Sequence, residues 1–364
     1  MSMARVMSSE YMLWAKTRSH ATFNLSNSGL TGYPLAELPA KIEDLEINGQ
    51  SFYGYQPLQK AIAAKCGVAT DCVVAANGAS MGNFLALAAT LEPGDEVLIE
   101  HPTYELLVSA AQYLGAEVKR FPRRFEDAFQ IDPREVELAI TPRTRLIVLT
   151  NLHNPSSAFT DEATLKAVGA IARGANARVL VGEIYLDALF ERTPRSAFHL
   201  GPEFVITNSL TKVYGLSGLR CGWILAEPAL AQKIWRLNDL MANHPPHVAE
   251  QLSCIALANL DRIAKRSRHL LDNNRLVFDR FLDERKDVEA PRFDYGTVSF
   301  PRLQGGNLGQ LCDLLRHKYD ATVVPGKFFE MPDHFRLGLG CETEVFAAGI
   351  QRLSNALDEL TEGH

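Results

Sequence analysis

The feature that most constrains the fold is an alternation of two kinds of segment between about Phe52 and Ala226. Short, continuously apolar runs, such as 146–149 and 179–181, predict strands that are covered on both faces. Longer, helix-like stretches separate them. Strands that alternate with helices favour an α/β fold, in which helices cover both faces of a mostly parallel sheet.

The order of the predicted elements divides the chain into three parts. In the region of alternation we expect helices over 57–65, from 77 onward, over 104–114 and over 161–173, and strands over 97–100, 116–121, 145–150, 178–181, 204–207 and 223–226. After about Pro245 the pattern changes to a long helical region, 248–284, with or without a bend, and a compact α+β tail. We therefore expect an N-terminal segment (1–48) that joins a small domain, a large domain (49–244), and a linking helix with the small C-terminal domain (245–364).

Composition excludes several classes of protein. A net charge of −6 without a basic tract argues against nucleic acid or an anionic membrane as partner. The six cysteines are scattered, without a CxxC pair, so neither a disulfide framework nor a metal site is expected, and a reducing compartment is favoured. The first residues lack the apolar core of a signal peptide, and no run approaches a membrane span. We expect a cytoplasmic protein.

Lys212 is the most informative single residue. It lies in the run Ser209-Leu-Thr-Lys-Val-Tyr-Gly-Leu-Ser-Gly-Leu-Arg220, between two apolar, strand-like segments. A desolvated lysine loses its proton more easily and becomes a nucleophile toward carbonyls. Ser209 and Arg220 offer a hydroxyl and a planar fork of donors, which suit a phosphate. An aldehyde-reactive amine beside a phosphate clamp indicates pyridoxal phosphate, whereas the alternative is a loop lysine near a surface arginine.

Two further clusters fit the same cofactor. Gly78-Ala79-Ser80 stands at the start of a predicted helix, where small residues let backbone N–H groups approach a phosphate. Tyr104 follows a predicted strand, at the edge of the sheet where α/β ligands bind, and can stack on a planar ring. Taken singly, each is also an ordinary way to begin a helix.

Three polar residues offer contacts to a ring oxygen or to a substrate. Asn154, in the polar turn after the most apolar strand, can donate from its amide, and Tyr185 can donate its hydroxyl to the same oxygen. Arg336 interrupts an otherwise apolar strand, and its planar fork suits a carboxylate. Alone, each of them is a common turn, packing or edge-strand residue.

Taken together and in this order, these segments resemble the class I/II aminotransferases, the pyridoxal-phosphate enzymes of the aspartate-aminotransferase fold (fold type I). The resemblance extends from about Asn27 to Leu360. It implies that Lys212 carries the cofactor as a Schiff base and moves protons, and that Arg336 binds the substrate α-carboxylate. The residues it assigns to the cofactor are Gly78, Ala79, Ser80, Ser209 and Arg220 for the phosphate, Tyr104 for the ring face, and Asn154 and Tyr185 for the ring oxygen.

The resemblance also implies a homodimer with shared active sites. Tyr53 resembles the tyrosine that reaches the phosphate of the neighbouring subunit, although Tyr55 is a rival. The segment Asn27-Ser-Gly29 resembles the N-terminal stretch that closes over a substrate.

Two positions depart from the family pattern. The family usually reads Asp-Glu-x-Tyr where this chain reads Gly182-Glu183-Ile184-Tyr185, so the aspartate that pairs with the pyridine nitrogen is missing. A strand bulge that turns Glu183 inward, or a buried water, are two ways to replace it. The family glycine after Asn-Pro-Ser/Thr is also missing, because Ser157-Ala158 stand there.

Three functions follow as hypotheses. The first is an aminotransferase that acts on an α-amino acid and a 2-oxo acid. The second keeps fold and cofactor but eliminates or replaces a group at the β-carbon of an amino acid. The third is a cofactor-binding protein with weak catalysis, which only Gly182 supports. The sequence does not identify the substrate side chain.

Overall fold

The large sheet confirms the α/β prediction. The computed structural model describes residues 6–49 and 52–362. Seven strands form a sheet in the order β2-β8-β7-β6-β5-β3-β4. β8 is antiparallel to β2 and β7, and all other neighbours are parallel. The strands are β2 (Val73–Asn77), β3 (Glu96–His101), β4 (Glu117–Pro122), β5 (Thr144–Thr150), β6 (Arg178–Gly182), β7 (Phe204–Ser209) and β8 (Cys221–Leu225).

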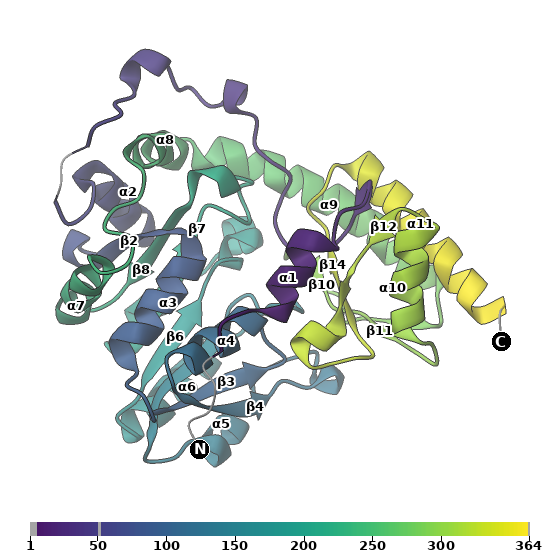
Figure 1. The fold of residues 1–364 in the computed structure, drawn as a ribbon, viewed down its shortest axis with the longest axis horizontal. Coiled ribbons are helices and arrows are strands. Elements are labelled where there is room, and N and C mark those ends of the chain that lie inside the picture. Colours follow the sequence, from purple (N-terminus) through teal and green to yellow (C-terminus); the bar gives the residue numbers. More distant parts are fainter. Residues whose placement is uncertain (1–5, 50–51, 363–364) are drawn as a thin grey trace.

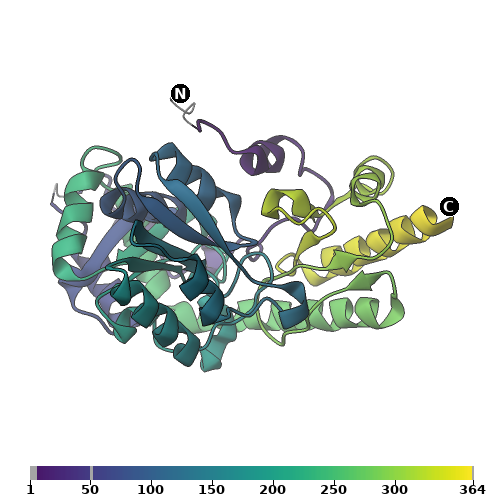
Figure 2. The ribbon, with the colours of Figure 1, turned by 90° about the horizontal axis from the view of Figure 1, so that it is seen from below.

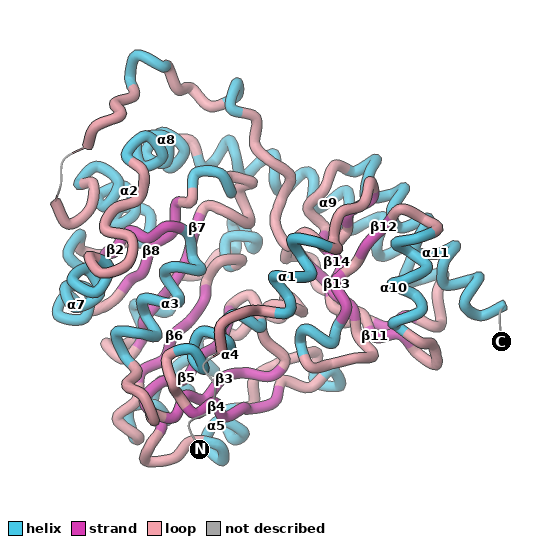
Figure 3. Tube along the Cα trace, viewed as in Figure 1, coloured by secondary structure: helices cyan, strands magenta, loops and turns pink. Residues whose placement is uncertain are grey.

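Helices cover both faces of this sheet (Figures 2 and 3). They are α2 (Gln56–Cys66), α3 (Gly78–Thr90), α4 (Glu105–Tyr113), α5 (Pro133–Ala139), α6 (Glu162–Gly174), α7 (Pro228–Asn238) and α8 (His247–Leu257). The sequence predicted α2, the start of α3, α4 and α6 to within one residue, but it missed α5, α7 and strand β2. β2 begins with four apolar residues and is followed directly by α3. Because no turn sequence separates them, the strand pattern merges with the helix pattern in the sequence.

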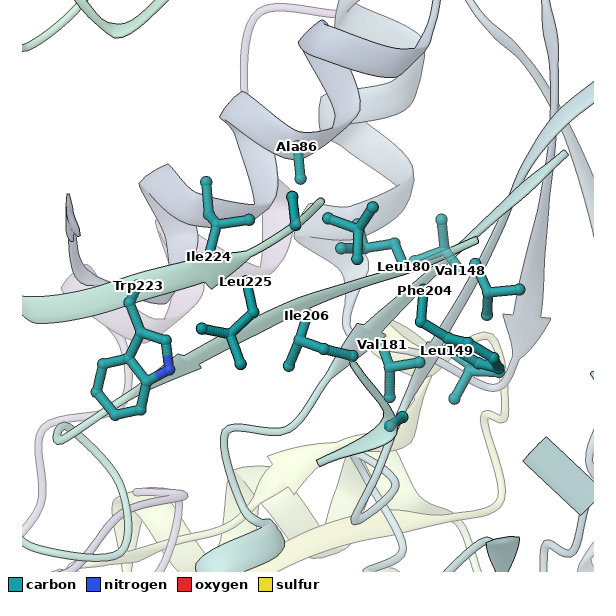
Figure 4. Packing of buried hydrophobic residues seen from close by; sticks show 14 of the residues in the cluster. Ala86, Val148, Leu149, Leu180, Val181, Phe204, Ile206, Trp223, Ile224 and Leu225 are labelled. Atoms are coloured by element: carbon teal, nitrogen blue, oxygen red, sulfur yellow. The ribbon is translucent and has the colours of Figure 1, made fainter. Parts of the chain in front are cut away.

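The core of the large sheet is apolar on both faces. Val148, Leu180, Ile206 and Ile224 come from four neighbouring strands, and each is at most 1% exposed. Figure 4 shows Ile224 on the face of the sheet beneath α3, which contributes Ala86, whereas Ile206 and Leu225 point to the opposite face. Full burial of a valine, leucine or isoleucine contributes roughly 1.5–3 kcal/mol, so this packing makes the sheet a rigid platform for the residues at its edge.

The C-terminal part packs around a second apolar cluster. Its strands are β10 (Val298–Ser299), β14 (Phe335–Gly338) and β13 (Val324–Pro325) in one antiparallel sheet, and β9 (Val288–Glu289) paired with β11 (Arg302–Leu303). Its helices are α10 (Leu308–His317) and α11 (Thr343–Glu362). The N-terminal segment joins this part, because β1 (Phe23–Asn24) pairs with β12 (Ala321–Thr322) and Leu25 is buried in the same cluster.

The predicted long helical region is two helices. α8 ends at Leu257, and α9 (Leu260–Glu284) then continues for 25 residues, about 38 Å of helix. Ile263, near its start, packs in the cluster of the large sheet, whereas Leu271 and Phe278 pack in the C-terminal cluster. α9 therefore connects the two cores (Figure 1).

A short N-terminal helix, α1 (Glu10–Thr17), was not predicted from the sequence. The Ser9 side chain caps it by accepting a hydrogen bond from Met12 N at 3.0 Å. The helix lies between the large sheet and the C-terminal part (Figures 1 and 2). Within the described residues, no helix is both long enough and apolar enough to cross a membrane.

Candidate active site

The carboxyl edge of the large sheet gathers the predicted site residues. β2, β3, β5, β6 and β7 run in the same direction, so they all end at this edge. The candidates follow these ends by a few residues: Gly78 after β2, Tyr104 after β3, Asn154 after β5, Tyr185 after β6 and Lys212 after β7. Arg220 reaches the same edge because it directly precedes the antiparallel strand β8. In an open α/β sheet, this edge is where ligands bind.

The start of α3 forms an open anion cradle. Gly78 has a φ of 80°, and a β-carbon there would overlap the Arg220 guanidinium, so glycine is required. Asn77 makes no side-chain capping bond, which leaves the first N–H groups of α3 free for a ligand. Arg220 Nη2 donates to Asn77 O at 3.2 Å. Open helix N–H groups beside an arginine suit a phosphate.

The remaining phosphate candidates lie at the same place. Ala79 and Ser80 belong to the first turn of α3. Ser209 ends β7 opposite Gly222 of β8, is 2% exposed, and accepts a hydrogen bond from Thr211 N at 3.4 Å.

Lys212 lies against the N-terminal segment. Leu30 N donates to Lys212 O at 2.8 Å, and a β-carbon on Gly29 would lie only 3.1 Å from Lys212 Cδ. Burial lowers the pKa of the Lys212 ammonium to about 8, and the charges of Arg336 and Arg220 act in the same direction. A lysine with this pKa is about half neutral at pH 8 and can attack a carbonyl carbon.

Arg336, in β14, is buried and still has an unused donor. Its guanidinium donates from Nη1 to Asn154 Oδ1 at 3.1 Å and from Nη2 to Ser26 O at 3.1 Å. The residue is 1% exposed, and its Nε has no partner among the described residues. A buried guanidinium with a free N–H is arranged to receive an anionic ligand.

Tyr11 of α1 is a site residue that sequence reasoning missed. Its hydroxyl accepts a second hydrogen bond from Arg336 Nη2 at 2.9 Å, and its ring packs edge-on against Tyr104 at 5.8 Å between centroids. Phe328 also packs edge-on against the Tyr11 ring, with 5.7 Å between centroids. The sequence does contain a signal for the helix that carries Tyr11, because Ser9 is a typical N-cap residue and a stretch with two aromatic residues follows it.

Tyr104 and Tyr185 approach the same region from the sheet edge. Burial raises the pKa of both phenols, and for Tyr104 the nearby Tyr11 and Tyr185 add to this rise. Both hydroxyls are therefore protonated at neutral pH and can act as hydrogen-bond donors. The structure thus brings together an amine, a buried arginine with an unused donor, and aromatic donors.

The family follows from a comparison with known proteins. The family model for class I and II aminotransferases matches residues 37–353. The chain belongs to this family. Pyridoxal phosphate is the cofactor of these enzymes, so it is the group that the site has to accommodate.

Relatives of this aminotransferase-family chain carry more than one kind of name. Capreomycidine synthase of Streptomyces vinaceus is 28% identical over 94% of this chain and 92% of its own length. Arginine–pyruvate transaminase of Pseudomonas aeruginosa is 27% identical over 90% and 89%. Among solved structures, an aminotransferase from Streptococcus suis has a TM-score of 0.91 at 26% identity, covering 98% of this chain and 99% of that one. The cyclase OrfR has a TM-score of 0.87 at 22% identity, with full coverage of both chains, and so shares the fold.

The residues present fit pyridoxal phosphate. In the described part of the chain, Lys212, Arg220 and Arg336 form hydrogen bonds only with neutral groups or none, and no carboxylate pairs with them. Three cations without anions favour a ligand with negative charge at both ends of the site. The cradle of α3 would hold the phosphate, Lys212 the aldehyde carbon, and Arg336 the carboxylate of a substrate.

Gly182 leaves the family's aspartate position without a carboxylate. A β-carbon at Gly182 would lie 3.1 Å from Ile184 Cδ1, 3.2 Å from Thr150 Cγ2 and 3.8 Å from Thr207 Oγ1. The Thr207 hydroxyl itself donates to Asn83 Oδ1 at 2.6 Å. The surroundings of Gly182 on this face are therefore apolar or neutral.

Glu183 does not replace the missing carboxylate in this structure. Its Oε1 accepts a hydrogen bond from Ala197 N at 2.7 Å, and β6 ends regularly at Gly182, paired with Thr150 and Thr207. Burial raises the pKa of the Glu183 carboxyl to about 7. The bulge considered as a way to turn Glu183 inward is not formed.

Ser157 takes over the backbone shape of the missing family glycine. Its φ is 69°, in the left-handed region that glycine usually occupies. Its hydroxyl donates to Val298 O at 2.7 Å, and this bond offsets part of the cost of the strained backbone. The turn that carries Asn154 therefore keeps a left-handed residue at this position.

Tyr53 and Tyr55 contact residues that are not among the site candidates of their own chain. Tyr53 is 52% exposed, and its hydroxyl donates to Asp239 Oδ2 at 3.2 Å. The Tyr55 ring packs edge-on against His247, with 4.9 Å between ring centroids. Neither of these contacts involves a residue of the phosphate cradle of the same chain.

Proposed function

We propose that the chain is an aminotransferase that moves an amino group between an α-amino acid and a 2-oxo acid, with pyridoxal phosphate held on Lys212. The observation that carries this proposal is the pairing of Lys212, with its lowered pKa, and the buried Arg336, whose Nε is unused. An amino acid whose carboxylate binds Arg336 would present its α-carbon to Lys212.

The residues then have separate tasks. When bound, pyridoxal phosphate withdraws electrons from the bonds of the substrate α-carbon. Neutral Lys212 takes the α-proton as a general base and gives it back as a general acid. Asn154 orients Arg336, which it contacts at 3.1 Å. Tyr104 would cover the ring face of the cofactor, and the Tyr185 hydroxyl would donate to its ring oxygen.

A second candidate is elimination or replacement at the β-carbon of an amino acid. Gly182 supports it, because a ring nitrogen without a carboxylate partner is a weaker electron acceptor, and amino transfer depends on strong acceptance. Two of the similar proteins are named as a synthase and a cyclase. The same feature supports the third hypothesis, a cofactor-binding protein with weak catalysis.

Lys212 is tested by trapping. Borohydride reduction of the purified protein followed by peptide mapping should place the reduced adduct on Lys212, and Lys212→Ala should abolish it. Because the neutral amine is the reactive form, adduct formation with added cofactor should rise with pH through a midpoint near 8. An adduct on another lysine, or a midpoint near that of free lysine, contradicts the assignment.

Product analysis separates the reactions. An aminotransferase consumes more than one equivalent of an amino acid only when a 2-oxo acid is present, and it then returns a new amino acid. Release of ammonia or of the β-substituent without an oxo acid establishes the β-carbon reaction. A bound cofactor whose absorbance does not change with any amino acid supports the weakly catalytic protein.

We also propose a homodimer whose partner subunits complete each other's sites. The support is the segment 33–49, which arches outside α8 at the periphery of the large domain (Figure 1). Leu35, Ile42 and Ile47 on it are 69%, 84% and 87% exposed. Large apolar side chains grouped on one segment indicate a surface that another chain covers.

A further inference from the structure

Two fully buried side chains of opposite charge lie beneath the loop that carries Asn154. Glu100 is near the end of β3, Arg123 directly follows β4, and neither side chain is exposed. Arg123 Nη1 donates to Glu100 Oε2 at 2.7 Å. Burial raises the pKa of the Glu100 carboxyl and lowers that of the Arg123 guanidinium. A buried ion pair adds little net stability, because desolvation offsets the attraction between the charges. The hydrogen bonds that the pair makes to the Asn154 loop indicate a different role, which is to hold that loop in place.

Glu100 holds the beginning of that loop. Its Oε1 accepts hydrogen bonds from Thr150 N at 2.8 Å and from Thr150 Oγ1 at 2.6 Å. The Thr150 hydroxyl has a single proton, and it donates this proton in the hydrogen bond to the Glu100 carboxylate. Thr150 Oγ1 must therefore face Asn154 N as an acceptor, at 3.0 Å. The charge on Glu100 thus sets the direction of the Thr150 hydroxyl and, through it, the place of Asn154.

Arg123 holds the end of the same loop. Its Nη2 donates to Thr160 Oγ1 at 3.2 Å. Thr160 is in turn paired with Asn151, whose Nδ2 donates to Thr160 O at 2.9 Å and whose Oδ1 accepts from Thr160 N at 3.0 Å. The ion pair therefore joins both ends of the loop, and Asn154 between them accepts from Arg336.

We propose that Glu100 and Arg123 are positioning residues, which hold Asn154 and, through it, the Arg336 guanidinium in the orientation that receives a substrate carboxylate. This inference rests on the proposed function of Arg336. It implies that a defect in the pair alters substrate binding and the surroundings of the cofactor more than it alters the fold.

Glu100→Gln in the holoenzyme tests the proposal. Glutamine has one oxygen, so its NH₂ group must face either the donors of Arg123 or the N–H of Thr150, and one of the two contacts is lost. We expect KM for the amino acid to rise about tenfold with a smaller change in kcat, because small misplacements of a binding group are costly. The pH midpoint of the bound cofactor's absorbance should also shift.

Glu96→Gln is the matched control. Glu96 lies on the same strand, is 2% exposed, and accepts hydrogen bonds from Thr141 Oγ1 at 2.9 Å and Thr144 Oγ1 at 2.5 Å, at the opposite end of β3. Neither of these hydrogen bonds involves a residue of the Asn154 loop. This variant should lower the melting temperature without moving KM or the absorbance midpoint.

Thr150→Val keeps the ion pair and the side-chain shape but removes the acceptor for Asn154 N, so it tests the same path if Glu100→Gln does not fold. It should raise KM and shift the absorbance midpoint in the same way. Wild-type KM and midpoint in the folded variants would overturn the proposal and leave the pair a purely structural role. If the unmodified holoenzyme converts no amino acid, the proposed function fails, whereas the absorbance comparison still decides the role of Glu100.

Discussion

Among individual residues, Gly182 is the one that we expect to weaken electron acceptance by the cofactor ring. The nearest groups to a side chain at this position are a methyl of Ile184, a methyl of Thr150 and the hydroxyl of Thr207. The first two lie at ends of side chains, and both are closer than an ordinary contact, so they would have to move by a few tenths of an ångström. The backbone of β6 here is regular strand, which an aspartate can adopt.

Gly182→Asp should accelerate the half-reaction with an amino acid. A carboxylate paired with the ring nitrogen is a charge-assisted contact worth roughly 1.5–3 kcal/mol. If it acts fully in the rate-limiting step, the rate rises about tenfold to a hundredfold. Stopped-flow absorbance of the bound cofactor measures this rate, and titration of the apo-protein with cofactor shows whether binding is retained.

Gly182→Asn is the control for size, since it adds the same volume without the charge. Steric damage should weaken cofactor binding in both variants, whereas an electronic gain should appear only in the aspartate variant. An aspartate variant that binds the cofactor normally and reacts no faster would show that another group already serves the ring nitrogen. The weakly catalytic hypothesis would then lose its only support, provided that the unmodified protein is active.

Among the elements, α1 has an effect larger than its eight residues suggest. It lies between the large sheet and the C-terminal part (Figure 2), and its Tyr11 hydroxyl accepts a hydrogen bond from Arg336. Arg336 Nη2 donates both to Tyr11 and to the backbone oxygen of Ser26. A carboxylate that takes two parallel bonds from the guanidinium competes with these acceptors. The side-chain hydroxyl can move away with its helix, whereas the backbone oxygen is held within its segment.

Tyr11→Phe should therefore lower KM for amino-acid substrates. A neutral hydrogen bond contributes about 0.5–1.5 kcal/mol net, so removal of the competing hydroxyl predicts a decrease of roughly twofold to tenfold. Steady-state kinetics at saturating 2-oxo acid provide the measurement. Tyr33→Phe, which removes a hydroxyl bonded to Glu37 O at 3.4 Å, serves as control. A rise in KM would instead mean that the Tyr11 hydroxyl contacts the substrate.

At the scale of the whole molecule, the position of Tyr53 bears on whether two subunits share their active sites. Its hydroxyl contacts Asp239 of its own chain, and its exposed ring belongs to the same part of the surface as Leu240, which is 79% exposed. In a symmetric dimer, one surface patch meets its own copy, so an exposed tyrosine on the patch can enter the partner's site.

We expect sedimentation of a dilute sample to give a dimer, and Tyr53→Phe to weaken cofactor binding by about tenfold or more, as loss of a hydrogen bond to a charged phosphate predicts. Tyr55→Phe, the rival position, should leave cofactor binding unchanged. A stable monomer that binds the cofactor at full strength would rule out the shared site. A loss of affinity in the Tyr55 variant alone would transfer the role to Tyr55.

The sequence by itself determined the fold class and the family. Short, continuously apolar runs are typical of strands covered on both faces, so 146–149 and 179–181 predicted β5 and β6 within a parallel sheet. The Lys212 run combines residues that cofactor chemistry requires close together in the chain. Signals of this kind are local, because they depend on periodicity and on neighbouring residue types.

Only the tertiary structure decided which distant residues meet. Tyr11 and Arg336 are 325 positions apart, and Thr150 and Glu100 are 50 apart, so no local pattern links them. The direction of β8 and the side to which Glu183 turns also depend on how neighbouring strands and loops pack. A buried polar group must find its partner wherever the fold brings one, and that choice is made by the packing of the whole chain.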